Sequence, residues 1–193
     1  MSEEGARVHR SYPREVALRD GTTIGVRLMT PSDSQRLLVF ARSLPADDLL
    51  FLRMDITKAF VLMLWGQNIK AGLTVTVLAE KDREVVGYAS MHHNEVSWQR
   101  HLGELRVQVG PAYRSRGLGG ALAGEIFEIA REMKLRKIVG QMTPDQPEAI
   151  ALVKRFGFQK EALLRDFVID RAGGTRDLLI MTCDVGSIAR TGG

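Results

Sequence analysis

The chain has little of several features that would narrow its class at once. Among its 193 residues there is one cysteine, Cys183, so no disulfide bond can form within the chain. The longest apolar run, from Ala59 to Trp65, is far shorter than the roughly 20 residues that a membrane-spanning helix needs. The N-terminus is polar and does not resemble a signal peptide. We therefore expect no membrane partner and a cytoplasmic location.

Charge of one sign is also not concentrated anywhere in the chain. The net charge at pH 7 is +4, and the basic residues are scattered among acidic ones. A nucleic-acid-binding domain usually gathers basic residues on one face or helix, so we expect no nucleic acid partner. The hydrophobic content of 45% and the charged content of 26% are typical of a globular protein. We expect a single domain at residues 13–185, with tails at 1–12 and 186–193.

The histidines and the cysteine form no metal-binding pattern. His92 and His93 are adjacent, so on a strand their side chains point to opposite faces of the sheet. Cys183 ends an apolar stretch at residues 178–183 that is typical of a strand. We expect it to be a small buried side chain rather than a nucleophile, and we expect no metal ligands.

The most informative stretch is residues 107–122, VQVGPAYRSRGLGGAL, in which a glycine-rich turn joins a strand to a helix. Backbone N–H groups at a helix start have no partner within the helix and lie at the positive end of its dipole. Glycine lets the main chain approach an anion closely. Arg114 and Arg116 add positive charge. The stretch therefore predicts a phosphate-binding loop.

Two other known sequence patterns of glycine-rich phosphate-binding loops do not match this stretch. The dinucleotide pattern needs a small residue where the chain has Leu122, and the Gly-Lys-Ser/Thr of the P-loop is missing. The pattern Arg-x-x-Gly-x-Gly does match, at Arg114, Gly117 and Gly119. It resembles the pyrophosphate-binding signature of the GCN5-related N-acetyltransferases (GNAT), which bind acetyl-CoA.

The order of expected elements agrees with this resemblance. Periodicity and turn signals predict two short strands within 15–29, a helix at about 31–43, helical structure in two pieces at about 47–68, and strands at 73–79, 84–92 and 102–109. They then predict a helix at 117–133, a strand at 137–141, a helix ending at Gly157, and two last strands joined by a turn at 172–174. The resemblance implies an α/β fold of the GNAT type, with a twisted mixed sheet and helices on both faces.

A second motif lies near the C-terminus. Residues 146–158, QPEAIALVKRFGF, resemble the family's Asn-x-x-Ala-x-x-Leu-Tyr-x-x-x-Gly-Phe segment. Gln146 stands at the position of the asparagine, and Val153 stands at the position of the tyrosine that often serves as a general acid. Valine cannot donate a proton, so the group that protonates the leaving thiolate stays open, with Tyr88, Tyr113 or water as candidates.

The resemblance also implies which residues bind the cofactor and which act on the substrate. Main-chain groups on Val107 and Val109 would contact the pantetheine arm and the acetyl oxygen. The pyrophosphate would be bound by the loop residues Arg114, Ser115, Arg116, Gly117, Leu118, Gly119 and Gly120, and Gln146 would also lie at the cofactor.

Glu104, which lies near the start of the strand at 102–109, would accept the proton of the attacking amine. The alternative is a glutamate that pairs with Arg106 or another cation.

The expected function is acetyl transfer from acetyl-CoA to a primary amine by direct attack in a ternary complex. A non-catalytic acetyl-CoA-binding module is the alternative, because Val153 departs from the family pattern. The acceptor stays open between an amine-bearing small molecule and a protein amine, and a homodimer stays open as well.

Overall fold

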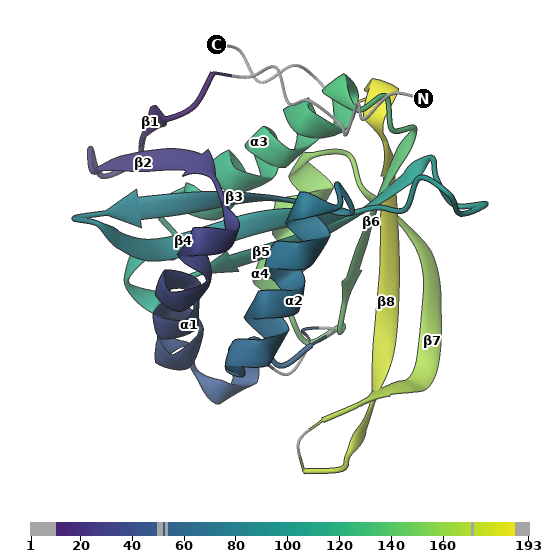
Figure 1. Ribbon diagram of the computed structural model, residues 1–193. Helices are drawn as coiled ribbons and strands as arrows, with labels where there is room; N and C mark the ends of the chain where they lie inside the picture. Colours follow the sequence, from purple (N-terminus) through teal and green to yellow (C-terminus); the bar gives the residue numbers. More distant parts are fainter. Residues whose placement is uncertain (1–10, 50–51, 53, 171, 188–193) are drawn as a thin grey trace.

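The structure is a computed structural model that describes residues 11–49, 52, 54–170 and 172–187 (Figure 1). Most of the two expected tails lies outside the described residues. Tyr12, at the end of the expected N-terminal tail, donates its hydroxyl to Glu125 (2.8 Å) and packs against the larger core cluster.

Eight strands and four α-helices are described, in the order that the sequence predicts. The strands are β1 (Arg14–Ala17), β2 (Thr23–Leu28), β3 (Thr74–Lys81), β4 (Glu84–His92), β5 (Leu102–Val109), β6 (Lys137–Met142), β7 (Gln159–Ile169) and β8 (Thr175–Asp184). The helices are α1 (Ser34–Ser43), α2 (Ala59–Lys70), α3 (Leu118–Glu132) and α4 (Pro147–Arg155), with short 3-10 turns at Pro31–Asp33, Ala46–Leu49, Pro111–Tyr113 and Val185–Ser187.

One expected helix is shorter than the sequence indicated. The first piece of the helical structure expected at 47–68 is a single 3-10 turn at Ala46–Leu49, and residues 50, 51 and 53 lie outside the described part of the chain. The α-helix begins only at Ala59. Asp55 accepts a hydrogen bond from the backbone N–H of Thr57 (3.1 Å). Such a local side-chain bond holds the chain in a turn that competes with the helix.

The strands form one mixed sheet in the order β1-β2-β3-β4-β5-β6-β8-β7, in which β5 and β6 run parallel. Helices α1 and α2 cover one face, and α3 and α4 cover the other (Figure 1). Successive residues of β4 show the alternation: Tyr88 packs in the α1/α2 cluster, whereas Ala89 packs in the cluster around α3. The structure therefore has the mixed α/β architecture that the sequence predicts.

Ion pairs fix the segment that leads from β2 into α1. Arg27 contacts Asp33 and Glu80, each at 2.6 Å, and Arg36 contacts Glu80 at 2.7 Å. The Asp33 carboxylate also accepts the backbone N–H of Thr30 (2.9 Å), which is a capping contact. We call Arg27, Asp33, Arg36 and Glu80 the N-terminal ion cluster.

The parallel strands β5 and β6 separate partway along their length. They pair from Leu102 and Lys137 to Leu105 and Gly140, but β5 continues to Val109 and β6 to Met142. The backbone of β5 beyond Leu105 therefore has no strand partner on this side. This fork positions the candidate site.

Two smaller expectations can be compared with the structure. Cys183 is 3% exposed, and its thiol contacts the carbonyl oxygen of Phe156 (3.2 Å), so the expectation of a buried thiol is confirmed. Burial raises the pKa of this thiol. Among the described residues, no helix combines the length and the hydropathy that crossing a membrane requires.

Candidate active site

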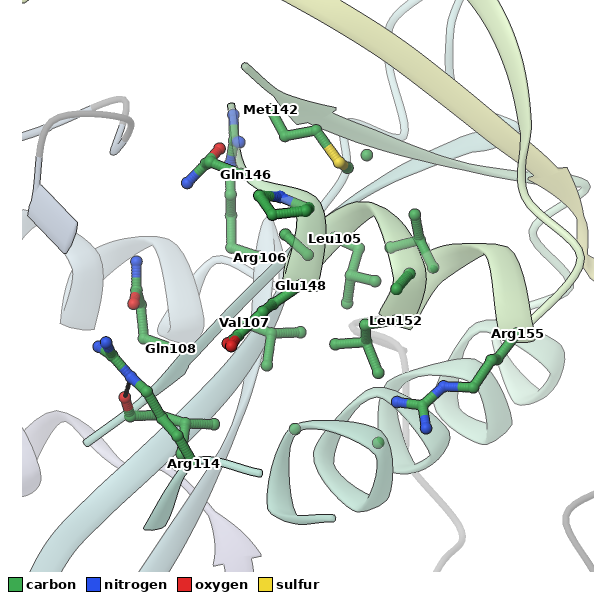
Figure 2. Close-up of a pocket in the computed structure, with 18 of the residues that line it drawn as sticks. Leu105, Arg106, Val107, Gln108, Arg114, Met142, Gln146, Glu148, Leu152 and Arg155 are labelled. Atoms are coloured by element: carbon green, nitrogen blue, oxygen red, sulfur yellow. Dashed lines mark hydrogen bonds between the residues drawn. The ribbon is translucent and has the colours of Figure 1, made fainter. Parts of the chain in front are cut away.

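A cavity of about 880 Å³ opens at the fork, between the end of β5, the start of α3, and α4 (Figure 2). We call it the glycine-loop cavity. Of the residues that the sequence assigned to the cofactor, the following line it: Val107, Val109, Arg114, Ser115, Gly117, Gly119, Gly120 and Gln146. Two segments that are far apart in the sequence therefore meet in one place.

The glycine loop begins α3 with an unusual backbone conformation. Ser115 and Gly117 have φ angles of 58° and 96°, and Gly117 is the N-cap residue. The Ala121 N–H donates back to the Gly117 carbonyl (3.1 Å), so the N–H groups of residues 118–120 precede the helical ladder. A side chain at Gly117 would be strained in this left-handed conformation. The loop thus presents main-chain donors at the positive end of a helix.

A β-carbon at Gly119 would make ordinary van der Waals contacts with three elements of the structure. A β-carbon there would lie 3.5 Å from Leu152 Cδ2, 3.7 Å from Val109 Cγ2 and 4.0 Å from Val107 Cγ1. The start of α3, helix α4 and the end of β5 therefore converge at Gly119. A larger side chain would fill the space where the three elements meet. Gly120 is less confined, since a β-carbon there would approach only Leu152 Cδ1, at 3.9 Å.

Arg114 fixes the loop to the rest of the site. Its Nε donates to the Val109 carbonyl oxygen (3.1 Å), drawn as a dashed line in Figure 2, and its guanidinium also pairs with Asp48. The Gln108 amide donates to the backbone carbonyl of Asp48 (3.1 Å). The 3-10 turn at Ala46–Leu49 is therefore tied to both β5 and the loop.

Two of the sequence-predicted loop residues do not line the glycine-loop cavity. Arg116 donates to Asp20 (3.0 Å), and its guanidinium lies 5.7 Å from the centre of the Tyr113 ring. The Leu118 side chain is buried in the core at 1% exposure. The side chains of both residues are thus engaged elsewhere, and only their main-chain groups belong to the loop.

Two cations at this cavity were missed by the sequence analysis. Arg19 and Arg155 both line it, and Figure 2 shows Arg155 extending from the end of α4. Arg19 Cγ lies 3.5 Å from where a Gly117 β-carbon would be. No local pattern marks either residue, because the fold brings them to the loop from distant segments. Their positive charge adds to the positive potential of the N–H groups of the loop.

On α4, the structure places both residues of the second motif at the cavity. Gln146 precedes the helix, and its side-chain oxygen accepts the backbone N–H of Thr143 (3.1 Å). Val153 is 5% exposed and lines the cavity while it packs in the core. Among the described residues that line this cavity there is no tyrosine.

A second cavity, of about 650 Å³, lies between α2 and the strands β3, β4, β5 and β6. We call it the Trp65 cavity. It is lined by Trp65 and Tyr88 together with His92, His93 and Glu104. Leu52, Arg106 and Gln141 line both cavities, so the two cavities meet at the fork. Arg106 spans the fork, because its guanidinium donates to the Gln141 carbonyl oxygen (2.9 Å).

Glu104, the candidate base, lines the Trp65 cavity. It forms an ion pair with Arg106, and the two side chains are 15% and 12% exposed. The pairing that the sequence offered as the alternative role is therefore present. The carboxylate nevertheless borders a cavity that reaches the fork, so a base role is geometrically open to it.

The two histidines differ in their hydrogen bonding. His92 lies opposite Glu104 in the sheet, and its ring nitrogens contact Thr74 Oγ1 (2.9 Å) and Ser90 Oγ (3.1 Å). His93 is 8% exposed, and its Nε2 has no hydrogen-bond partner among the described residues. In the described part of the chain no cluster of three or more His, Cys, Asp or Glu residues could hold a metal ion.

Comparisons with known proteins show the family and the fold. A model of the acetyltransferase (GNAT) family matches residues 47–158, which include β5, the glycine loop and α4. The chain is similar to a ribosomal-protein-alanine N-acetyltransferase from Brucella melitensis, with 26% identity, a TM-score of 0.71, and coverage of 82% of this chain and 98% of that chain.

Two further structures share the fold. A GNAT-family acetyltransferase from Streptococcus pneumoniae has 21% identity and a TM-score of 0.72, with coverage of 83% of this chain and 99% of that one. A phosphinothricin acetyltransferase from Sinorhizobium meliloti, in complex with acetyl-CoA, has 20% identity and a TM-score of 0.73, with coverage of 89% and 93%. The family model matches more than half of the chain, and the chain therefore belongs to the acetyltransferase (GNAT) family.

Proposed function

We propose that this protein transfers the acetyl group of acetyl-CoA to a primary amine by direct attack while both substrates are bound. The observation that carries the proposal is that two cavities on different sides of the sheet meet at the fork between β5 and β6. The glycine-loop cavity holds main-chain donors and cations together with Asp48 and Glu148, and the Trp65 cavity holds Glu104. Two substrates bound in this way would bring their reacting atoms together, and such positioning can supply much of the rate.

The residues of the glycine-loop cavity fit acetyl-CoA. The N–H groups of residues 117–120 and the cations Arg19 and Arg155 suit a pyrophosphate. The unpaired edge of β5 offers main-chain groups on Val107 and Val109 to the pantetheine arm, although the Val109 carbonyl already accepts from Arg114. Acetyl-CoA supplies the thioester carbonyl that the amine attacks.

The chain's own residues would accept the amine proton and stabilise the developing charge. A backbone N–H at the free edge of β5 would stabilise the negative charge that develops on the thioester oxygen. Glu104, from the Trp65 cavity, would accept the ammonium proton directly or through water. Water would protonate the departing thiolate, since no tyrosine is found among the described residues of the glycine-loop cavity.

The experiment is calorimetric titration of acetyl-CoA into the wild type and Gly119→Val, followed by an assay of free thiol release with a panel of amines. The valine would fill the space beside Leu152 and Val109, so we expect at least ~100-fold weaker binding, or about 2.7 kcal/mol. Gly186→Val is the matched control, because a β-carbon at Gly186 meets nothing within 4 Å. Unchanged affinity in a folded Gly119→Val protein would contradict the proposal.

A non-catalytic acetyl-CoA-binding module is the second candidate. It is favoured by one observation, the buried Val153 at the position where the family motif often has a tyrosine. Tight acetyl-CoA binding without amine-dependent thiol release across the panel would support this function over acetyl transfer.

A further inference from the structure

Three buried polar atoms have no hydrogen-bond partner within the described residues: Tyr88 Oη, His93 Nε2 and Arg106 Nε. All three residues line the Trp65 cavity. Folded proteins satisfy the large majority of their buried polar groups, because a buried polar group without a hydrogen bond is energetically costly. The shared location of these atoms indicates that a bound molecule completes their hydrogen bonding.

Tyr88 is held rigidly with its hydroxyl protonated. The side chain is fully buried, and its ring makes edge contacts with Trp65 and Phe40 at centroid distances of 5.3 and 6.2 Å. Burial raises the phenol pKa, and the Arg106 charge opposes this rise only in part. Tyr88 and Arg106 line the same cavity. Tyr88 can therefore donate a hydrogen bond toward the cavity at neutral pH.

Arg106 retains donors for a ligand. A guanidinium carries five N–H donors and no acceptor. The hydrogen bonds of Arg106 go to the Gln141 carbonyl and to the Glu104 carboxylate, and Nε has none. Only an acceptor atom can satisfy Nε. Because the neighbouring Tyr88 hydroxyl is also a donor, the ligand group expected here is rich in acceptor oxygens, as a carboxylate is.

The charges of the cavity exclude a polycation as the preferred ligand. Glu104 is the one carboxylate among the described residues that line the Trp65 cavity, and it is already paired with Arg106. A polyamine brings two or more positive charges and would meet a single, partly neutralised negative charge. A molecule with one ammonium and one carboxylate matches Glu104 and Arg106 without an unpaired charge.

We propose that the Trp65 cavity binds an α-amino acid as the acetyl acceptor, with its ammonium at Glu104 and its carboxylate at Arg106 and Tyr88. Glu104 and Arg106 lie two residues apart on one face of β5 and contact each other, so the two ligand charges must also be close, as in an α-amino acid. The apolar part of the ligand would lie against Met54, Ile56, Trp65, Leu73, Leu102 and Val139. This inference rests on the proposed acetyl transfer.

The first test compares acceptors that differ only in the carboxylate. Thiol release is measured with L-phenylalanine and phenethylamine, with L-leucine and isopentylamine, and with spermidine. We expect kcat/KM to be at least ~10-fold higher for each amino acid than for its decarboxylated partner, and lowest for spermidine. Equal or better activity with the simple amines or with spermidine would overturn the inference and leave acetyl transfer intact.

Tyr88→Phe tests the same contact from the protein side. It removes one hydroxyl, and we expect KM for the amino acid to rise about 10-fold, with little change in kcat or in KM for the decarboxylated amine. Tyr113→Phe is the control, because Tyr113 lines neither cavity. An equal rise in KM for both acceptors would indicate a merely structural role and would contradict the inference.

Calorimetry keeps the two proposals distinguishable. L-Phenylalanine and phenethylamine are titrated into the protein with CoA present. Tighter binding of the amino acid without thiol release from any acceptor would support the cavity assignment while acetyl transfer fails. No preference for the amino acid in this titration would overturn the assignment itself.

Discussion

Two groups of ion pairs in this protein use the same residue types in opposite ways. In the N-terminal ion cluster all three nitrogens of the Arg27 guanidinium side chain donate, to Asp33, Glu80 and the Leu28 carbonyl. In the Glu104–Arg106 pair, Arg106 Nε has no partner among the described residues. The first group joins β2, β3 and the start of α1, whereas the second borders two cavities.

The two groups differ in whether any hydrogen-bond donor is left for a ligand. Asp33 is 5% exposed, and hydrogen bonds from Arg27 and Thr30 hold its carboxyl pKa well below the ordinary value. A closed network of this kind has nothing left to offer a ligand and contributes to stability. The Glu104–Arg106 pair, in contrast, lies at a cavity and leaves the Arg106 Nε donor for a substrate. Substitutions in the two groups should therefore change different properties.

The largest expected effect comes from making the same substitution in both groups. Glu104→Gln should lower kcat by roughly 10²–10⁴-fold with acetyl-CoA affinity nearly unchanged, because the amide cannot accept the ammonium proton. Glu80→Gln should lower the melting temperature and leave kcat unchanged, because Glu80 contacts only the N-terminal ion cluster among the interactions described for it. Similar kcat values for the two variants would exclude Glu104 as the base.

A smaller effect, on stability, is expected from Asp33→Asn. Removing the charge leaves Arg27 without its buried partner, and we expect a loss of about 1.5–3 kcal/mol in the free energy of unfolding. The folded-state pKa of Asp33 is depressed, so its contribution is present above the ordinary value of 3.8 and is lost as the pH falls below it.

Urea denaturation of the wild type and Asp33→Asn at pH 7 and at pH 3 measures both effects. The difference in unfolding free energy between the two proteins should shrink at the lower pH. The exposed Asp47→Asn is the control. A difference that does not depend on pH would show that the Asp33 charge is not what stabilises the segment.

The glycine loop could be predicted from the sequence because its signal is local. The helix start and the preceding strand both follow from one short stretch of chain, and the structure adds the positive φ at Gly117. The parallel pairing of β5 and β6 ends at Leu105 and Gly140, a feature of register that no local sequence pattern shows. Arg19 and Arg155 reach the loop from distant segments, and no spacing rule could have found them.

The Trp65 cavity was harder to predict because its residues carry ordinary strand signals. Tyr88 and His92 simply alternate with apolar residues along β4, and their hydrogen bonding depends on α2 and β3. Trp98 and His101, in the segment between β4 and β5, do not line the cavity, and Trp98 is 87% exposed. Sequence periodicity shows which face a residue occupies, but it does not show which polar atoms stay unpaired there.

The smallest expected effect concerns the leaving thiolate and Val153. This residue lies on α4 at the wall of the glycine-loop cavity, where a phenol could donate a proton to the sulfur. If thiolate departure limits the rate, Val153→Tyr should raise kcat by no more than about 10-fold, which is less than the roughly 10²–10⁴-fold that a fully positioned proton donor contributes. Because Val153 is 5% exposed, the larger side chain should also cost about 1–3 kcal/mol of stability.

Steady-state kinetics and thermal melting measure the two effects separately, with Val153→Phe as the control for added bulk without a donor. A gain in Val153→Tyr that is absent in Val153→Phe would identify the missing acid. Equal kcat in both variants would show that water protonates the thiolate fast enough, and that α4 needs no proton donor at position 153.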